Sequence, residues 1–391
     1  MDKRKTPVPG TSALDAWAEA RLAEMERASL RREILEVEPL AGMRVRRNGR
    51  ELLNFSSNDY LGLAQHPQIK KVAAEAAEQY GAGAGASRHV TGTHPVYPEL
   101  ETELAAMKQA EAACVFGSGY LANIGVIPAL AGKGDLVVMD KLCHACIYDG
   151  VKLSGAAVER YSHNSLDSLN NILKDSNNYN NCIIITETVF SMDGDRAPVK
   201  ELLAMAERHN AWLMTDDAHG FGVVEPEARA HIQMGTLSKA VGSYGGYVCA
   251  SRPVIEYIKN RARSLMFTTA LPPAIVAGAL ASLTVMRADS ERGRKALGNA
   301  RRFTEMLGLP EAQSAIVPMI LGSAEAALAA SRKLEEGGFL VQAIRPPTVP
   351  ANTARLRFTF SALHLDEDIE SMIKYIKDNK LYLQSNVKNE S

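Results

Sequence analysis

The stretch AWLMTDDAHG, residues 211–220, places a short apolar run directly before two aspartates and, two residues after them, a histidine. Comparable runs recur between helical stretches from about residue 66 to about residue 285, and they read AACVFGS, DLVVMD, NCIIITE and GGYVCAS. Short apolar runs separated by helices predict a mostly parallel sheet with helices on both faces. The chain is therefore expected to have an α/β fold, with its ligands at the carboxyl ends of the strands.

The polar residues that end these runs form a second pattern. In chain order they supply a glycine turn before a helix, a histidine, a serine, an aspartate with a histidine three residues on, and a lysine. The five ends read FGSGYLAN (116–123), MDKLCHA (139–145), TETVFSMDGD (186–195), TDDAHGFG (215–222) and MGTLSKA (234–240). A glycine turn at a helix N-terminus suits a phosphate, and a buried carboxylate needs a cationic partner.

A lysine among small and hydroxyl-bearing residues, as at Lys239, loses its proton readily if its pocket is dry. Each of these residues alone has an ordinary explanation: the aspartate caps a helix, the serine forms a turn, and the histidine satisfies a core contact. Together and in this order they predict a site for pyridoxal 5′-phosphate (PLP). Lys239 would form the Schiff base, and Asp216 would keep the pyridine nitrogen protonated.

Two other motifs favour different chemistry only at first sight. GAGAGA (81–86) matches a dinucleotide-binding pattern, but it follows the helical IKKVAAEAAEQY instead of a strand, which argues against a nicotinamide site. CHAC (143–146) has the CxxC spacing of a zinc or thioredoxin-like site, yet no second CxxC or histidine pair completes a zinc shell. Two buried thiols are the favoured interpretation, and no metal is expected.

Composition excludes several classes of protein. The chain has 391 residues, of which 46% are apolar and 23% charged, and its net charge is -1. This balance gives no reason to expect nucleic acid or an acidic membrane as a partner. No apolar run approaches the ~20 residues that span a bilayer, and the N-terminus lacks the apolar core of a secretory signal. Five cysteines in so long a chain indicate no disulfide framework, so a cytoplasmic location is expected.

Three regions are expected from the pattern. Apolar residues recur at helical spacing in 13–35, which suggests an amphipathic helical arm within residues 1–50. Residues 51–285 would form the large cofactor-binding domain. The pattern restarts after about 286 with SAIVPMIL and ARLRFTFS, so residues 286–391 are expected to form a small α+β domain.

The chain resembles the α-oxoamine synthases, a family of fold-type I PLP-dependent enzymes. The resemblance runs from about residue 12 to 375 and rests on NFSSNDYLGL, VFSMDGD, TDDAHG, GTLSKA, TTALPP and AIRPPTVPANTARLRFTFSALH. It implies a fold-type I transferase that works as a homodimer. It also implies a decarboxylative condensation of an amino acid with an acyl thioester. The last motif most resembles the member that joins L-alanine to a pimeloyl thioester, carried by coenzyme A or acyl carrier protein, in biotin biosynthesis.

The resemblance also assigns roles to individual residues. Lys239 and Asp216 keep the roles given above, His219 would hydrogen-bond the phenolic oxygen of PLP, and His144 would stack on its ring. Further cofactor contacts are implied for Gly119, Tyr120, Ser191, Thr236, Thr268 and Thr269. The last two would reach the phosphate of the other subunit. Asn58 and Arg357 would hold the carboxylate of the amino acid. Arg31 and Thr348 would hold the acyl group.

Some alternatives remain open. Sister enzymes that make 5-aminolevulinate, 2-amino-3-oxobutyrate or 3-ketosphinganine share the cofactor motifs, and an aminotransferase could share Asp216 and Lys239. A non-catalytic cofactor-binding or scaffold protein would be expected to have lost one of those two residues.

One departure from the family pattern concerns the active-site region. The stretch from Val224 to Met234 is shorter than in many relatives, which is expected to reshape the entrance of the cleft.

Overall fold

The computed structural model describes residues 12–381 and divides the chain into two compact units. The first combines the chain up to Phe55 with Pro318–Phe358 and the chain from Lys374, and the second comprises Ser56–Val317 and Thr359–Ile373. The boundaries expected near residues 50 and 285 stay a prediction. Every residue of the cofactor motifs from FGSGYLAN to MGTLSKA lies in the second unit.

A seven-stranded sheet forms the centre of the second unit, in the order β4-β10-β9-β8-β7-β5-β6. β10 pairs antiparallel with both of its neighbours, whereas every other neighbouring pair is parallel, so the prediction of a mostly parallel sheet is confirmed. The strands span Ala112–Phe116 (β4), Leu136–Asp140 (β5), Ala157–Tyr161 (β6), Cys182–Glu187 (β7), Trp212–Asp216 (β8), Ile232–Thr236 (β9) and Gly246–Ala250 (β10).

Helices cover both faces of this sheet because alternate strand residues are apolar on both sides. On one face, Cys114, Met139 and Met214 pack with α5 (Gly119–Leu130), α6 (Ala145–Ser154), α9 (Arg252–Arg261) and α10 (Arg263–Met266). The other face has two apolar clusters. The first is formed with α2 (Pro67–Tyr80), α4 (Val96–Lys108), α11 (Pro273–Ala288) and α12 (Glu291–Leu307), and the second with α7 (Leu166–Leu173) and α8 (Val199–Arg208).

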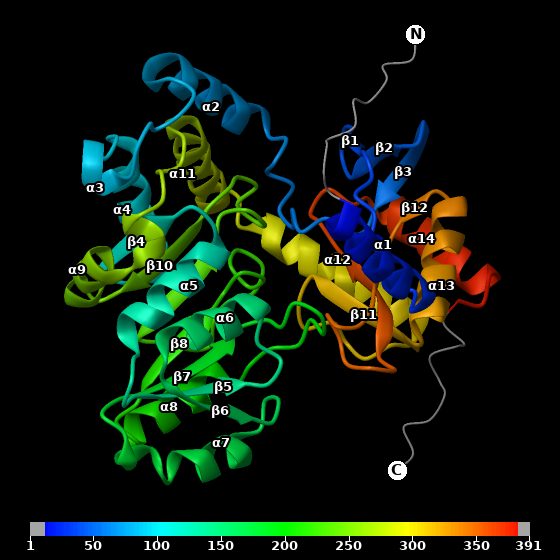
Figure 1. Ribbon diagram of the computed structural model, residues 1–391. Helices are drawn as coiled ribbons and strands as arrows, with labels where there is room; N and C mark the ends of the chain where they lie inside the picture. The colour runs from blue at the N-terminus through cyan, green and yellow to red at the C-terminus, as the bar shows by residue number, and fades with distance from the viewer. Residues whose placement is uncertain (1–11, 382–391) are drawn as a thin grey trace. The chain divides into compact units, whose positions relative to one another are not determined.

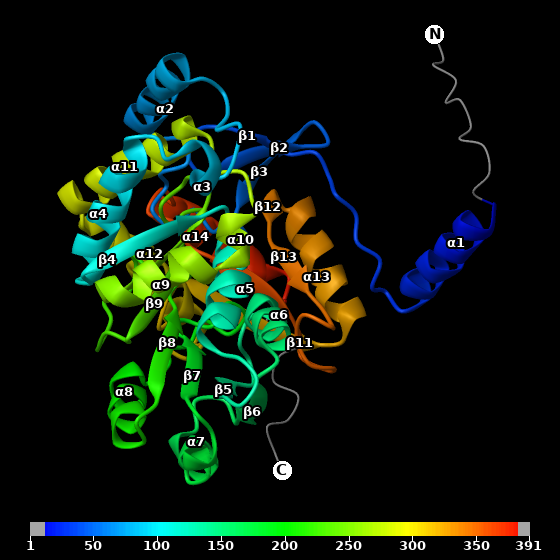
Figure 2. The same ribbon diagram turned by 60° about the vertical axis from the view of Figure 1, so that its left-hand side comes forward.

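Figures 1 and 2 both show α11 beside α2 and α4, in agreement with the contacts of α11 with each of these two helices. The GAGAGA stretch follows α2, so a helix precedes it as the sequence predicted. Short helical turns complete this unit at α3 (Arg88–Thr91) and η1 (Ser176–Asn178). No helix within residues 12–381 is both long and apolar enough to cross a membrane.

The remaining elements belong wholly or partly to the first unit. A four-stranded sheet has the order β1-β2-β3-β12, and a three-stranded sheet has the order β11-β14-β13. These strands span Glu38–Pro39 (β1), Arg44–Arg47 (β2), Arg50–Asn54 (β3), Ile316–Gly322 (β11), Phe339–Leu340 (β12), Gln342–Ile344 (β13) and Ala354–Thr359 (β14). The helices are α1 (Ser12–Arg27), α13 (Ala324–Glu336) and α14 (Asp366–Asp378).

The N-terminal helix α1 is shorter than the apolar spacing over 13–35 suggested. It ends at Arg27, and Ser29 adopts a left-handed conformation with φ 54°, which an α-helix cannot contain. None of its residues is buried, and Leu14 and Trp17 are 62% and 60% exposed. The spacing of apolar residues therefore located the helix but overstated its length.

Candidate active site

The carboxyl ends of parallel strands bring distant polar residues to one edge of the seven-stranded sheet. Glu187 at the end of β7 lies opposite Asp216 at the end of β8, and Asp216 lies opposite Met234 in β9. Thr236 ends β9 and precedes Lys239 by three residues. The order of strands therefore gathers the motifs that the sequence placed at strand ends.

Asp216 is a buried carboxylate, with 4% of its surface exposed. It accepts hydrogen bonds from Asn123 Nδ2 on α5 at 2.9 Å and from the backbone N–H of Ala218 at 3.0 Å. Burial raises its pKa, although the charge of Lys239 acts in the opposite direction. Within residues 12–381, no lysine, arginine or histidine forms an ion pair with it. A buried carboxylate in this setting suits a cationic ligand group.

Lys239, His219 and Tyr60 form a hydrogen-bonded chain. Lys239 Nζ lies 2.7 Å from His219 Nε2, and His219 Nδ1 lies 2.7 Å from the hydroxyl of Tyr60. That hydroxyl donates to Asn58 Oδ1 at 3.0 Å. Sequence reasoning singled out three of these four residues and missed Tyr60. The available signal was its place in NFSSNDYLGL, two residues after Asn58.

His144 is exposed and caps the N-terminus of α6. Its Nδ1 accepts from the backbone N–H of Cys146 at 3.2 Å and lies 2.9 Å from the Cys146 sulfur. Asn123 Nδ2 donates to the same sulfur at 3.1 Å. Because Asn123 also donates to Asp216, the Cys146 sulfur links His144 to Asp216 through Asn123. Cys143 and Cys146 are free and buried, and burial raises the pKa of Cys146 to about 12. The interpretation of CHAC as two buried thiols is confirmed.

The N-terminus of α5 offers a place for an anion. Ser118 caps this helix by accepting from the backbone N–H of Leu121 at 3.0 Å. A Cβ at Gly119 would lie 3.4 Å from Cβ of Thr236, so this end of the helix stands against the end of β9. The Thr236 and Ser238 hydroxyls lie 2.7 Å apart. Backbone N–H groups beside hydroxyl groups form the usual surroundings of a phosphate.

Four more residues that the resemblance implied as cofactor contacts lie in the same unit. Tyr120, which is 45% exposed, donates its hydroxyl to Asp149. Ser191 is buried in the loop after β7. Thr268 and Thr269 line a small cavity beside Gly117, where β4 has just ended.

The loop that carries Ser191 is held by a histidine between two carboxylates. His163 Nδ1 lies 3.1 Å from Asp140, and its Nε2 lies 2.7 Å from Asp195. Burial by itself would lower the pKa of His163, but the hydrogen bonds to the two carboxylates raise it to about 10. The imidazolium therefore joins the end of β5 to the VFSMDGD loop at neutral pH. Sequence reasoning had not identified His163.

The residues expected to bind the acyl group and Arg357 belong to the first unit. Thr348 accepts a hydrogen bond from Arg32 Nη2 at 3.0 Å, whereas Arg31 forms an exposed ion pair with Glu26 at 3.4 Å. Arg357 is buried in β14. The arginine that contacts Thr348 is thus the neighbour of the one that the resemblance selected.

The residues of the second unit fit PLP. The buried Asp216 carboxylate suits a protonated pyridine nitrogen. The N-terminus of α5 and the hydroxyl of Thr236 suit a phosphate, and Lys239 supplies the amine. Within the described chain, no cluster of three or more histidine, cysteine or acidic side chains is arranged to hold a metal.

Comparison with known proteins identifies the relatives of this chain. The model of the family "Aminotransferase class I and II" matches residues 50–376. A protein of Methylobacterium sp. (strain 4-46) named 8-amino-7-oxononanoate synthase is 54% identical over 373 residues, which cover 95% of this chain and 98% of the relative. A protein of Maricaulis maris with the same name is 51% identical over 378 residues, with 94% and 96% coverage.

Solved structures agree with the fold. A lysine-to-alanine variant of serine palmitoyltransferase from S. paucimobilis, with a bound PLP–myriocin aldimine, is 30% identical and superposes with a TM-score of 0.88, covering 95% of this chain and 99% of that structure. An 8-amino-7-oxononanoate synthase of Francisella tularensis is 28% identical, with a TM-score of 0.72 and coverage of 85% and 98%. The expected α/β fold of fold-type I enzymes is thereby confirmed.

Proposed function

This chain belongs to the aminotransferase class I and II family, among relatives named 8-amino-7-oxononanoate synthase, and from this premise we propose its reaction. It condenses L-alanine with a pimeloyl thioester in a PLP-dependent reaction that yields 8-amino-7-oxononanoate, carbon dioxide and the free thiol carrier. The structural observation that carries the proposal is the buried Asp216, which has no cationic partner within residues 12–381 and shares an edge of the sheet with the Lys239–His219 pair.

The balance of the reaction follows from its bonds. The bond between the α-carbon of alanine and its carboxylate breaks and releases carbon dioxide. A bond forms between that carbon and the acyl carbon, whose bond to sulfur breaks. The thiol leaves and the α-carbon is protonated again. When bound, PLP supplies an electron sink for the carbanion at the α-carbon.

The residues of this chain would act around that carbon. Asp216 would hold the pyridine nitrogen in its protonated form, because a buried carboxylate favours a neighbouring positive charge. Lys239 would hold the cofactor covalently and, once displaced by the amine of alanine, would take the α-proton with its free amine. His219, 2.7 Å from that amine, would keep it in position, and His144 would cover the ring.

The substrate contacts belong to the same proposal. Asn58 and Arg357 would bind the carboxylate of alanine, and Arg31 and Thr348 would bind the far carboxylate of the pimeloyl chain. We include Arg32 with them, because its guanidinium already donates to Thr348. The working form would be a cytoplasmic homodimer in which Thr268 and Thr269 reach the phosphate in the other subunit.

A substrate panel tests the reaction. Purified protein is incubated with alanine, glycine or serine against acetyl, succinyl, pimeloyl and palmitoyl thioesters of coenzyme A, and pimeloyl acyl carrier protein is included. We expect alanine and a pimeloyl thioester to give 8-amino-7-oxononanoate, identified by mass spectrometry, with one carbon dioxide released per product. Preference for another pair would assign a sister reaction. A parallel incubation replaces the thioester by a 2-oxo acid, and transfer of the amino group to it without release of carbon dioxide would identify an aminotransferase.

A further inference from the structure

Tyr60 is a buried tyrosine at the centre of the candidate site. Its side chain is fully buried, and its hydroxyl lies within hydrogen-bond distance of both Asn58 and His219. His219 is 5% exposed, so water has little access to the imidazole. The hydroxyl therefore joins the residue proposed to bind the substrate carboxylate to the one beside the reactive lysine.

Counting protons determines the direction of these hydrogen bonds. The Tyr60 hydroxyl has one proton, and it donates this proton to Asn58 Oδ1. The 2.7 Å contact with His219 must then use the proton on Nδ1, which donates to the Tyr60 oxygen. In a neutral imidazole, the other nitrogen is left as an acceptor. Nε2 can therefore accept from the Lys239 ammonium, which lies 2.7 Å away.

We infer that Tyr60 is a positioning residue that holds His219 in the tautomer with Nδ1 protonated, and so makes Nε2 the acceptor for a proton from Lys239. The transfer is balanced: the ammonium of Lys239 loses one proton and becomes a neutral amine, and His219 gains it and becomes an imidazolium. The Tyr60 oxygen accepts from Nδ1 both before and after the transfer. This role rests on the proposed function, because there the Lys239 amine must be neutral in order to attach PLP.

Tyr247 provides a matched control. It is also a fully buried tyrosine of the second unit, and its hydroxyl has no hydrogen-bond partner among the described residues. Tyr60→Phe and Tyr247→Phe each remove one buried hydroxyl, but only the first removes an acceptor from His219. An effect of losing a buried hydroxyl in general would appear in both variants.

Nitrogen NMR of the cofactor-free protein, labelled with ¹⁵N-histidine, tests the tautomer directly. His219→Gln identifies the signals by their loss. In the wild type we expect Nδ1 of His219 to be protonated and Nε2 to be unprotonated. Tyr60→Phe should move the proton to Nε2, and Tyr247→Phe should leave the pattern unchanged. A wild-type His219 protonated only on Nε2 would overturn the inference, even if Tyr60→Phe failed to fold.

A second measurement follows the attachment of PLP by absorbance after mixing with cofactor-free protein. Loss of one hydrogen bond of this kind corresponds to about tenfold, so Tyr60→Phe should attach PLP about tenfold more slowly. Tyr247→Phe should match the wild type. Equal rates in all three proteins would contradict the role of Tyr60. Neither measurement needs substrate, so failure to form 8-amino-7-oxononanoate would count against the proposed function and leave this result intact.

Discussion

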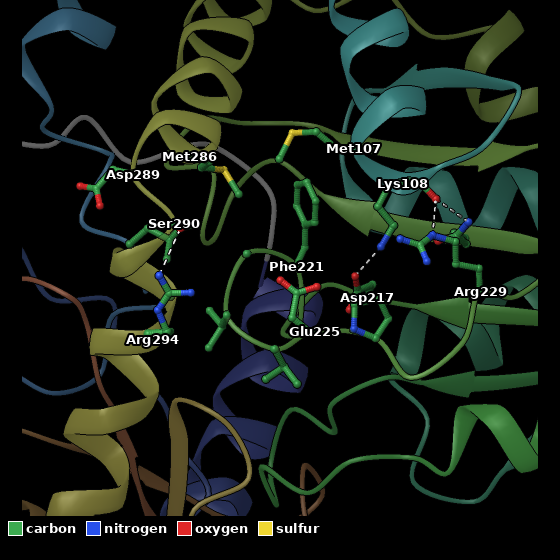
Figure 3. A pocket seen from close by; sticks show the side chains of 17 residues that line it. Met107, Lys108, Asp217, Phe221, Glu225, Arg229, Met286, Asp289, Ser290 and Arg294 are labelled. Carbon is green, nitrogen blue, oxygen red and sulfur yellow. Dashed lines mark hydrogen bonds and ion pairs between the residues drawn. The ribbon is translucent and has the colours of Figure 1, made fainter.

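Asp216 and Asp217 are neighbours in the chain, yet they belong to two different regions of the second unit. Asp216 lies with Asn123 of α5 and pairs with no cation of the described chain. Asp217 accepts from Lys108 Nζ of α4 at 2.6 Å and from the hydroxyl of Thr188. Figure 3 shows Lys108 pointing at Asp217, with Phe221 nearby. Lys108 neutralises Asp217, whereas Asp216 has no ion-pair partner within residues 12–381, as the proposed contact with PLP requires.

The surroundings of the two carboxylates differ as well. A cavity of about 330 Å³ borders the Lys108–Asp217 pair, and Val224, Glu225 and Arg229 line it. Part of the stretch from Val224 to Met234 therefore borders the Asp217 region. Two adjacent acidic residues at the end of a strand can therefore have different partners, because successive side chains point to opposite faces of a sheet.

Replacing Lys239 gives the largest expected effect. Lys239→Ala should keep the fold and abolish formation of 8-amino-7-oxononanoate, because Lys239 is the amine proposed to hold PLP. In the wild type, borohydride should trap the cofactor on Lys239, which peptide mass spectrometry can locate. Trapping on Lys133 or Lys141 would refute the assignment.

Replacing each aspartate should separate chemistry from stability. Asp216→Asn should still bind PLP through the phosphate contacts but lose about two to three orders of magnitude in turnover, as for the removal of one catalytic electrostatic contact. Asp217→Asn should retain most of its turnover and instead lower the denaturation midpoint. If folded Asp217→Asn loses as much turnover as Asp216→Asn, the division of roles between the two carboxylates is wrong.

The internal pair can be tested by stability alone. Lys108 and Asp217 are each 6% exposed at the side chain, so Lys108→Met leaves a buried carboxylate without its cation. Such a change costs about 3 to 5 kcal/mol, and replacing both partners by apolar residues is often neutral. Lys108→Met should be clearly less stable in urea than the double variant Lys108→Met/Asp217→Leu. Equal losses would show that the pair contributes little.

A smaller effect should depend on pH through His163. Its pKa is raised from 6.5 to about 10 in the folded chain, so the folded state holds this proton more tightly than the unfolded state. The stabilisation is complete below the unfolded value, declines as the pH rises above it, and is lost by the time the pH passes about 10. Urea midpoints measured across this range should fall in the wild type more steeply than in His163→Gln. If the urea midpoints of the two proteins fell equally with pH, His163 would not be the cause of the pH dependence.

The smallest effect concerns the acyl contacts in the first unit. Arg32→Ala removes a charge-assisted donor from Thr348 and should raise the KM for the pimeloyl thioester by about tenfold. Arg31→Ala should raise it less, because the structure pairs Arg31 with Glu26 at the surface. Spectra with alanine alone should be unchanged in both variants. A larger effect of Arg31→Ala would make Arg31, and not Arg32, the main contact of the acyl group.

The sequence by itself determined the class of fold and the chemical set of the candidate site. Short apolar runs ending in polar residues are a local pattern, and the carboxyl ends of parallel strands must meet at one edge. Asp216, Lys239 and the glycine turn at Gly119 could therefore be grouped without coordinates. The buried thiols of CHAC followed from the absence of further ligands in the sequence.

Only the tertiary structure decided which groups touch. The hydroxyl of Tyr60 meets His219 across 159 positions of sequence, and Arg32 reaches Thr348 across 316, so neither contact leaves a local signal. The same holds for the contrast between Asp216 and Asp217, which differ in their partners but not in residue type. Such contacts depend on strand register and helix packing, where a shift of one residue turns a side chain to the other face.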